Sequence, residues 1–466
     1  MPGARVHIIG IGGIGTSALA RVLKHWGYRV SGSDAAASEI TAALEREGIA
    51  VAIGHGVDAA RGADLAIYSA AVRDDNPELA ATRAAGIPTV KRAALLGLIA
   101  DAREGLAVAG THGKSTTSAM LAKICVDAGR DPTFFVGAIL QDFGTNARPG
   151  GGDLVVVEAD EYDRSFLQLH PRVAIVTNVE PDHPDTYPTY EEMEAAYVEF
   201  LRQVRPGGAI LLSADDPGCS RLQERVAPAS GVTIIPYGRA PGATWRIEPD
   251  GAGGETMLRD GEPVATLTLR VPGEHNRRNA LAALATAAQV GIDPGVAAAS
   301  LAEFRGIGRR FELKGEAAGI TVVDDYAHHP TEIAVGVRAA RERFPGRPLW
   351  VVFQPHTYSR TRLLLREFAE ALAPADRVVL LDIYAARERD TLGVSADDIA
   401  ALLPPGNPPL RAASPAAAVA TLLDRYRAGD LSPGAVVLTM GAGDVWLTGE
   451  GLLHELRDER PDASQS

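Results

Sequence analysis

The sequence alternates short, mainly apolar runs with longer amphipathic stretches along its whole length. Typical runs are residues 153–160 (DLVVVEAD), 172–180 (RVAIVTNVE) and 376–384 (DRVVLLDIY). Apolar strands that alternate with helices form parallel sheets that helices cover on both faces. We therefore expect an α/β protein.

The length of the chain indicates more than one domain. At 466 residues it exceeds what one hydrophobic core usually organises. The pattern of runs breaks near residues 102 and 309. We expect three domains, over residues 1–102, 103–309 and 310–466.

Composition and charge narrow the class of protein. Hydrophobic residues make up 46% and charged residues 23% of the chain, as in an ordinary globular protein. A net charge of −13 argues against a nucleic-acid partner. Two cysteines are too few for a disulfide framework or a cysteine-ligated zinc site. The sequence contains neither the features of a signal peptide nor an apolar run long enough to span a membrane, so we expect a cytoplasmic protein with no membrane partner.

A glycine motif near the N-terminus indicates phosphate binding. Residues 10–15 (GIGGIG) match GxGxxG and lie between an apolar run and a helical stretch. Such glycines let the backbone approach a pyrophosphate at the positive end of a helix. Asp34 ends the next expected strand, where a carboxylate would accept a ribose hydroxyl. The motif by itself leaves an NAD-dependent oxidoreductase open.

A second loop, residues 110–116 (GTHGKST), resembles a P-loop. It departs from GxxxxGK[ST] because Val108 stands where that pattern has its first glycine. Its amides would cradle phosphates, Lys114 would reach the β and γ oxygens, and the Ser115 hydroxyl would ligate Mg²⁺. The loop therefore predicts a nucleoside triphosphate site.

Metal-competent side chains follow two of the expected strands. They are Glu158, Asp160, Glu161 and Asp163 after one strand, and Asn178, Glu180, Asp182 and His183 after the next. A phosphate-binding loop needs a carboxylate at a strand end to hold its metal. We expect the metal here, and interpret Asp215 and Asp216 as ordinary loop acids.

Three further segments carry polar side chains in positions suited to ligands. Residues 272–279 (PGEHNRRN) lead into an alanine-rich helix, and their side chains lie on its first turn. Residues 324–330 (DDYAHHP) and 354–362 (QPHTYSRTR) follow strands, where open α/β sheets bind ligands. The paired histidines could bind zinc, but no third ligand stands at the right spacing.

Together and in this order, these segments resemble the Mur ligase family of peptidoglycan synthesis over essentially the whole chain. The segments that carry the resemblance are GTHGKST, EADE, TNVEPDH, GEHNRRNA, RRFE and DDYAHHP. GIGGIGTS, YSAAVRDDNPE, FQPHTYSRTR and TMGAGDVW are most similar to the branch that adds L-alanine. The murein tripeptide recycling branch, which EADEYD also fits, is the alternative.

The resemblance implies a fold, a reaction and its partners. The fold would comprise a Rossmann-like N-terminal domain, a P-loop ATPase-like central domain and a Rossmann-like C-terminal domain that brings the amino acid and closes over the site. The partners would be UDP-N-acetylmuramate, L-alanine, ATP and Mg²⁺, and the protein would be a monomer or homodimer. The lactyl carboxylate would be activated as an acyl phosphate and then attacked by the amine of L-alanine.

The resemblance also implies a role for individual residues. The N-terminal glycines would then hold the diphosphate of the sugar nucleotide and no nicotinamide. The substrate-binding residues would be Gly12, Gly13, Gly15, Asp34, His55, Asn146, Arg148, Tyr326, His356, Arg360 and Arg362. The ATP-binding residues would be Gly110, Thr111, His112, Gly113, Lys114, Ser115, Thr116, His275, Asn276, Asn279, Arg310 and Asp325. The metal ligands would be Ser115, Glu158 and His183, and the catalytic residues Lys114, Glu158, His183 and His328.

Lysine usage departs from that of several relatives. Those relatives carry a carbamylated lysine near the second magnesium, whereas this chain has no lysine between Lys123 and Lys314. Tyr197 falls roughly at the corresponding place. The second hypothesis, an NAD-dependent oxidoreductase with a fused ATPase domain, explains the N-terminal glycines but leaves EADE, TNVEPDH and the third domain without a role.

Overall fold

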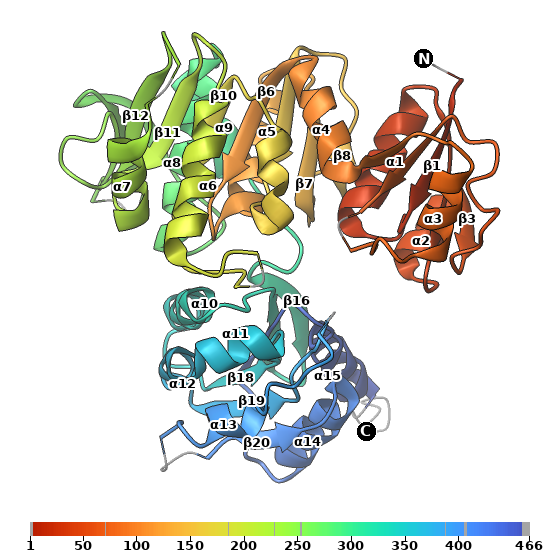
Figure 1. Cartoon of the computed structure of the whole chain (residues 1–466). Coiled ribbons are helices and arrows are strands. Elements are labelled where there is room, and N and C mark those ends of the chain that lie inside the picture. The colour runs from red at the N-terminus through yellow and green to blue at the C-terminus, as the bar shows by residue number, and fades with distance from the viewer. Residues whose placement is uncertain are drawn as a thin grey trace, which may run out of the picture. The chain divides into compact units, whose positions relative to one another are not determined.

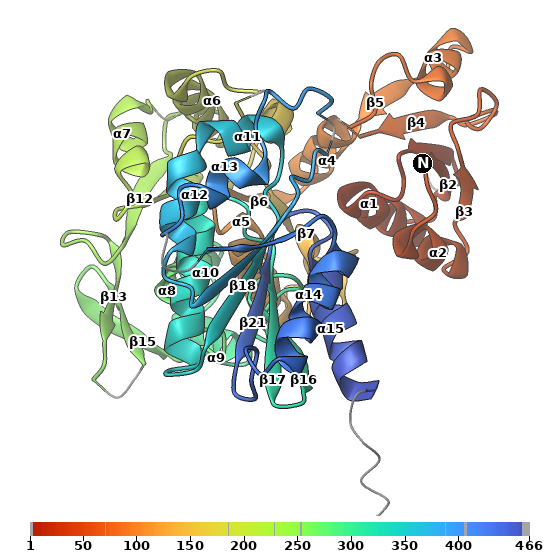
Figure 2. The same cartoon turned by 90° about the horizontal axis from the view of Figure 1, so that it is seen from below.

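The computed structural model describes residues 3–69, 71–184, 186–227, 229–251, 254–386, 388–404 and 408–458. Contacts divide the chain into two units, Met1–Val271 with Asn276–Ile307 and Pro272–His275 with Gly308–Ser466. The described residues form sheets of five, ten and six strands (Figures 1 and 2). Within these ranges no helix combines the length and apolar character needed to cross a membrane.

The N-terminal sheet is wholly parallel, with the order β3-β2-β1-β4-β5. Its strands are β1 (Arg5–Ile9), β2 (Arg29–Asp34), β3 (Ala50–Ile53), β4 (Leu65–Tyr68) and β5 (Thr89–Lys91). The helices are α1 (Ile14–His25), α2 (Glu39–Arg46), α3 (Pro77–Ala84) and α4 (Arg92–Asp101). The strand order reverses at β1, and the glycine loop follows β1, so this loop lies where open α/β sheets bind ligands.

The central sheet has the order β15-β14-β13-β12-β11-β10-β6-β9-β7-β8. Its strands are β6 (Glu104–Ala109), β7 (Thr133–Leu140), β8 (Thr145–Arg148), β9 (Leu154–Glu158), β10 (Val173–Val176), β11 (Ala209–Ser213), β12 (Thr233–Gly238), β13 (Trp245–Pro249), β14 (Glu255–Arg259) and β15 (Glu262–Leu267). The helices are α5 (Lys114–Asp127), the 3₁₀ helix η1 (Tyr162–Gln168), α6 (Tyr190–Arg202), α7 (Pro217–Arg225), α8 (Glu274–Gln289) and α9 (Pro294–Ala302).

The third sheet has the order β16-β17-β21-β18-β19-β20. Its strands are β16 (Glu312–Ala317), β17 (Ile320–Asp325), β18 (Leu349–Phe353), β19 (Arg377–Leu381), β20 (Leu410–Ala412) and β21 (Val436–Met440). The helices are α10 (Pro330–Arg343), α11 (Tyr358–Leu363), α12 (Leu365–Leu372), α13 (Ala396–Ala400), α14 (Pro415–Arg427) and α15 (Trp446–Asp458). Figure 2 shows β17, β18 and β21 between α10 and α12 on one face and α14 and α15 on the other.

Burial on both faces explains why the strands are apolar throughout. On β9, Val155 and Val157 belong to one hydrophobic cluster, and Leu154 and Val156 belong to the cluster on the opposite face. Every one of these side chains is excluded from solvent. The predicted α/β class with parallel sheets is therefore confirmed for the interior of each sheet.

The edges of two sheets differ from the expectation of parallel strands. In the central sheet, β13, β14 and β15 pair antiparallel, as do β7 and β8. In the third sheet β16 pairs antiparallel with β17. An antiparallel strand needs only a hairpin connection and can leave one face to solvent, so its sequence need not be apolar throughout.

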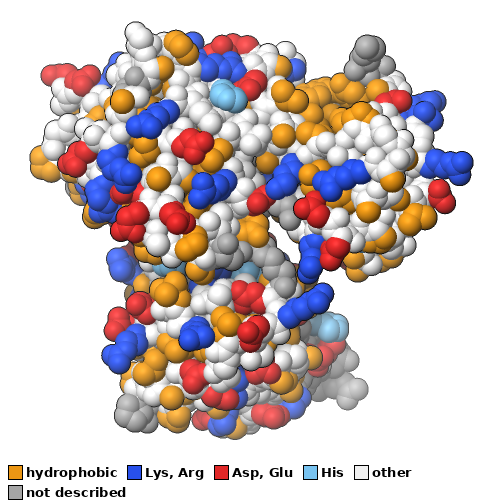
Figure 3. Space-filling view, in the orientation of Figure 1, with side chains coloured by type: hydrophobic (Ala, Val, Ile, Leu, Met, Phe, Trp, Pro, Cys, Tyr) orange, Lys and Arg blue, Asp and Glu red, His pale blue; other side chains and the backbone are white. Residues whose placement is uncertain are grey.

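Charged side chains of both signs are interspersed over the face that Figure 3 shows. Neither sign dominates that face as a continuous field. This distribution fits an acidic protein whose anion sites are built locally from loops and helix ends.

Candidate active site

The N-terminal glycine loop is fixed by the end of β2. The amides of Gly10 and Ile11 donate to the Ser33 carbonyl oxygen at 2.8 and 2.9 Å. The Gly12 amide donates to Asp34 Oδ2 at 2.8 Å. The predicted acid Asp34 therefore holds the loop itself, beside any contact it makes with a ribose.

Asn146 is brought to the same loop, and Arg148 is paired elsewhere. Asn146 Nδ2 donates to the Ile14 carbonyl oxygen at 2.9 Å, which joins β8 to the start of α1. Arg148 forms an ion pair with Asp131, with Nη2 and Oδ1 2.8 Å apart. A Cβ added to Gly15 would lie 2.9 Å from Nη1 of Arg92, so a guanidinium also flanks this loop.

The second glycine loop connects β6 to α5 and has no room for side chains at its two glycines. A Cβ on Gly110 would lie 2.0 Å from Thr177 Oγ1, and one on Gly113 2.7 Å from Asn279 Oδ1. Both glycines have positive φ, +131° and +82°. The loop therefore presents backbone at the N-terminus of α5, which is the arrangement that holds phosphate groups.

Lys114 begins α5 and lies largely buried among acceptors. Its Nζ donates to the carbonyl oxygens of Gly110 and Thr111 at 2.5 and 3.1 Å and to Glu161 Oε1 at 2.9 Å. Burial disfavours the ammonium, but the nearby carboxylates, Glu161 foremost, outweigh it and raise the pKa of Lys114. A permanent positive charge therefore stands beside the loop.

Ser115, at the start of α5, contacts Glu158, at the end of β9. Ser115 Oγ donates to Glu158 Oε1 at 2.9 Å, and the Gly137 amide donates to Glu158 Oε2 at 2.6 Å. Burial raises the pKa of Glu158 despite these hydrogen bonds and the charge of Lys114. A hydroxyl and a carboxylate at this place form an oxygen donor pair of the kind that Mg²⁺ prefers.

Glu161 links the loop lysine to His183. It is fully buried, and its Oε1 lies 2.9 Å from Lys114 Nζ and 3.5 Å from His183 Nε2. Burial opposes ionisation, but Lys114 and His183 outweigh it and lower the pKa of Glu161. Its Oε2 has no hydrogen-bond partner among the described residues.

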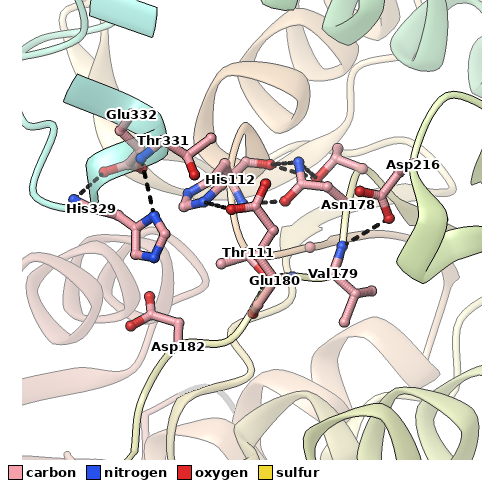
Figure 4. Close-up of polar contacts among 12 residues, drawn as sticks. Thr111, His112, Asn178, Val179, Glu180, Asp182, Asp216, His329, Thr331 and Glu332 are labelled. Carbon is pink, nitrogen blue, oxygen red and sulfur yellow. Dashed lines mark hydrogen bonds and ion pairs between the residues drawn. The ribbon is translucent and has the colours of Figure 1, made fainter. Parts of the chain in front are cut away.

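The segment after β10 locks the loop from the other side, as Figure 4 shows. Asn178 Oδ1 accepts from the His112 amide at 2.9 Å, and its Nδ2 donates to the His112 carbonyl oxygen at 3.0 Å. The Glu180 amide donates to Thr111 Oγ1 at 2.9 Å. Asp216 accepts from the Val179 amide at 3.2 Å and from the Cys219 amide at the start of α7, so this acid has a structural role.

Asp215 likewise accepts from the backbone amides of Arg239 and Ala240.

The start of α8 reaches the same loop. Asn276 and Asn279 are both buried, and Asn279 Nδ2 donates to Asn276 Oδ1 at 3.4 Å. His275, predicted with them, belongs by its contacts to the second unit. The P-loop, the strand-end acids and the two asparagines are therefore brought together in the first unit.

A second cluster lies in the C-terminal unit, at the end of β17. Arg310 Nη1 lies 3.2 Å from Glu332 Oε1, and its guanidinium carbon lies 5.3 Å from the centroid of the Tyr326 ring. Burial raises the pKa of Asp325 to about 7, although Arg310 opposes the shift. Glu332, which pairs with both Arg310 and His328, was not singled out in the sequence.

His328, His356 and Arg360 are adjacent in this cluster. The rings of His328 and His356 lie 5.6 Å apart in an edge-on arrangement. His356 Nδ1 lies 3.1 Å from Arg360 Nη1. Arg360 is buried, whereas Arg362, predicted with it, is exposed. The C-terminal unit thus groups imidazoles and a buried guanidinium.

Tyr197 lies on α6 and is completely buried. Burial raises the pKa of its phenol well above the usual value, and the charge of Glu161 adds to the shift. Tyr197 therefore stays a neutral phenol.

Three residues of the clusters described in the two units escaped prediction or were given no particular role: Arg92, Glu161 and Glu332. Glu161 acts through a partner far away in sequence, Lys114. The third acid of EADE was the only local signal for Glu161. No pattern at Arg92 or Glu332 indicated a site.

Family models match most of the chain. The model described as "Mur ligase family, catalytic domain" matches residues 5–104, "Mur ligase middle domain" matches 108–287, and "Mur ligase, glutamate ligase domain" matches 309–443.

Curated relatives and solved structures match over nearly full length. The UDP-N-acetylmuramate–L-alanine ligase of Mycolicibacterium gilvum is 44% identical and that of Thermobifida fusca 43%, covering 97% of this chain and 97% and 96% of theirs. The structure of UDP-N-acetylmuramate-alanine ligase from Thermotoga maritima has a TM-score of 0.80 at 30% identity, covering 98% of this chain and all of that one. A murein peptide ligase from Psychrobacter arcticus shares the fold, with a TM-score of 0.76 at 24% identity over 99% of this chain and all of that one.

Proposed function

The chain belongs to the Mur ligase family, and on that basis we propose that it joins L-alanine to the lactyl carboxylate of UDP-N-acetylmuramate, with conversion of ATP to ADP and phosphate. Relatives named for this reaction are 43% to 46% identical over nearly the full length. The protein is then an ATP-dependent carboxylate–amine ligase of peptidoglycan synthesis. We assign it to the cytoplasm, where its substrates would be made.

One observation carries the ATP-dependent part of the proposal. Lys114, Ser115 and Glu158 converge at a loop whose glycines leave no room for a Cβ. Amides at a helix N-terminus, a buried ammonium and a hydroxyl–carboxylate pair together suit the triphosphate of ATP. Asn276 and Asn279 border the same loop and would add contacts to the nucleotide.

The donor set also fits magnesium. Ser115 and Glu158 would hold one ion, and His183 a second, with the unpartnered Oε2 of Glu161 beside it. Bound Mg²⁺ would neutralise charge on the phosphates. The chain has no lysine between Lys123 and Lys314, and Glu161 would supply a buried carboxylate beside His183 instead.

In the first step, the lactyl carboxylate attacks the γ-phosphorus of ATP, and ADP leaves. Lys114 would donate to the phosphate oxygens and stabilise the charge that develops there. The product is an acyl phosphate, in which the bridging oxygen comes from the carboxylate. Glu161 keeps Lys114 charged and fixes its Nζ near the loop.

In the second step, the amine of L-alanine attacks the acyl carbon and phosphate leaves. We assign the cluster of the C-terminal unit to the amino acid, with Arg360 for its carboxylate. His328 Nδ1 faces the Tyr326 carbonyl oxygen at 3.0 Å. A carbonyl only accepts, so Nδ1 carries the proton and Nε2 keeps the lone pair that a general base needs.

The N-terminal glycine loop would hold the diphosphate of the sugar nucleotide. Gly12, Gly13 and Gly15 would present their backbone, and Arg92 adds a positive charge beside Gly15. His55 would face the uridine and Asn146 the muramoyl sugar. We retain three domains, 1–102, 103–309 and 310–466, each with its own sheet.

An amino-acid-dependence assay tests the proposal. Purified protein with UDP-N-acetylmuramate, ATP and Mg²⁺ should release phosphate when L-alanine is added. Release with L-Ala-γ-D-Glu-diaminopimelate but not with L-alanine would instead identify a recycling ligase. Tight binding of NADH, detected by its fluorescence, would favour an oxidoreductase, an alternative that the comparisons do not support.

A further inference from the structure

A buried carboxylate lies beneath the N-terminal glycine loop. Glu78, at the start of α3, has no exposed surface. Its Oε1 lies 2.7 Å from His7 Nε2, and its Oε2 lies 2.5 Å from Ser33 Oγ and 2.8 Å from His55 Nδ1. Its partners therefore come from β1, β2 and the loop after β3.

Glu78 is ionised at neutral pH. Burial by itself would raise the pKa of this carboxyl, but the hydrogen bonds from His7, Ser33 and His55 together hold the pKa below its usual value. The N-terminus of α3, which Asn76 caps, adds a favourable field. The carboxylate therefore only accepts hydrogen bonds.

An acceptor at this place determines the tautomer of both imidazoles. His55 must donate from Nδ1, and His7 must donate from Nε2. The other ring nitrogen of His7, Nδ1, lies 2.9 Å from Ser31 Oγ. The His55 side chain is 20% exposed, whereas Glu78 is not exposed at all. The ring of His55 thus runs from a buried anchor to the surface, and its Nε2 carries the lone pair of the neutral ring.

The same carboxylate is connected to the glycine loop through Ser33. The Ser33 hydroxyl donates to Glu78, while its carbonyl oxygen accepts from the amides of Gly10 and Ile11. The next residue, Asp34, accepts from the Gly12 amide. One buried group therefore fixes both the imidazole and the strand end that shapes the loop.

We propose that Glu78 is a positioning residue for the nucleotide end of the sugar nucleotide. It holds His55 in the Nδ1–H tautomer, so that Nε2 faces the nucleoside, and it anchors the end of β2 under the diphosphate loop. The inference rests on the proposed function, because it takes the N-terminal domain to bind the sugar nucleotide. No chemical step is assigned to Glu78.

The tautomer can be measured without any substrate. In ¹⁵N-imidazole spectra of the full chain, His55 should show a protonated Nδ1 and an unprotonated Nε2 near pH 8. Glu78→Gln, which keeps the shape, should convert His55 to a mixture of tautomers, whereas Glu45→Gln, at an exposed position of α2, should not. An Nε2–H tautomer in the unmutated protein would overturn the proposal.

Binding measurements separate this inference from the proposed function. In calorimetric titrations, Glu78→Gln should lower the affinity for UDP-N-acetylmuramate about tenfold and leave the affinity for ATP unchanged. The reason is that a charged hydrogen-bond acceptor is lost in the N-terminal domain only. In a double-mutant cycle, His55→Asn should reduce the affinity for UDP-N-acetylmuramate much less in the Glu78→Gln background than in the unmutated protein. Unaltered sugar-nucleotide affinity in a folded Glu78→Gln variant would refute the role of Glu78. If the unmutated protein bound no sugar nucleotide, that result would instead refute the proposed function, and the tautomer result would still hold.

Discussion

The side chain of Lys114 has two partners in the proposed mechanism, the buried Glu161 and the phosphates of ATP. We expect Lys114→Ala to lower kcat by about 10³-fold, because a preorganised charge is lost where negative charge develops. Binding of UDP-N-acetylmuramate should be unchanged, since the N-terminal glycine loop is separate. Steady-state kinetics and calorimetry measure the two quantities.

Loss of Lys114 also removes the ammonium that faces the buried Glu161 carboxylate, so folding must be checked. A circular-dichroism melt provides that check, and Lys114→Arg retains the charge if the alanine variant is unstable. Lys24→Ala, at an exposed position on α1, is the matched control. Turnover within a few fold of normal in a folded Lys114→Ala variant would show that this loop does not act on ATP.

Asp325 should make stability depend on pH. Burial raises the pKa of Asp325 from 3.8 to about 7 in the folded protein, so ionising the buried group costs folding free energy. Its contribution to stability is complete below the unfolded-state pKa and is lost as the pH rises through about 7. The charged groups that face it are Arg310, Glu332 and Asp324.

Asp325→Asn removes this titration. We expect the melting temperature of the variant, minus that of the unmutated protein, to increase between about pH 5 and about pH 8. Taking the difference between the two melting temperatures removes the effect of all titratable groups that the two proteins have in common. A difference that stays constant over this range would contradict the raised pKa.

At the residue scale, the sequence predicts groups that act within one contiguous motif. Lys114, Ser115 and their loop were found because strand, glycines and helix follow one another. Glu161 was predicted only as one of several metal-competent acids and Glu78 was given no role, because each depends on a partner 47 or 71 residues away. Only the folded chain brings such pairs together.

The loop between β6 and α5 should tolerate no side chain at Gly113. A Cβ there would lie 2.7 Å from Asn279 Oδ1, and φ is +82°. Gly113→Ala should therefore displace the loop or the start of α8 and lower kcat/KM for ATP by about 10²-fold.

Gly129→Ala is the matched control, since φ is +73° and a Cβ there meets nothing within 4 Å. Both variants bear the backbone cost of about 1–2 kcal/mol, but only the first introduces a steric overlap. Melting curves and ATP kinetics for the pair measure the difference. Equal effects of the two substitutions on ATP kinetics would contradict the close packing of the loop.

At the element scale, fully buried strands were predictable and edge strands were not. The run LVVVE of β9 is apolar because both of its faces are covered. In β13, which lies in the antiparallel part of the central sheet, Trp245 and Ile247 are buried and Glu248 and Pro249 are exposed, so its sequence resembles a loop. Antiparallel edges therefore had to come from the structure.

At the scale of the whole molecule, an acidic protein is proposed to bind two anionic substrates. The net charge of −13 gives no general attraction for ATP or a UDP-sugar. The helix N-terminus at α5, Lys114 and Arg92 supply positive potential where it is needed. The net charge therefore argues against a nucleic-acid partner but not against nucleotide substrates.

In the proposed reaction, the lactyl carboxylate is activated by phosphorylation from ATP and is then joined to L-alanine. The most direct test uses UDP-N-acetylmuramate labelled with ¹⁸O in both carboxylate oxygens, with ATP, Mg²⁺ and L-alanine, followed by mass spectrometry of the products. The UDP-N-acetylmuramoyl-L-alanine product should retain one ¹⁸O in its new amide, and the released phosphate should carry the other. Unlabelled phosphate, or no alanine-containing product, would contradict the proposed reaction.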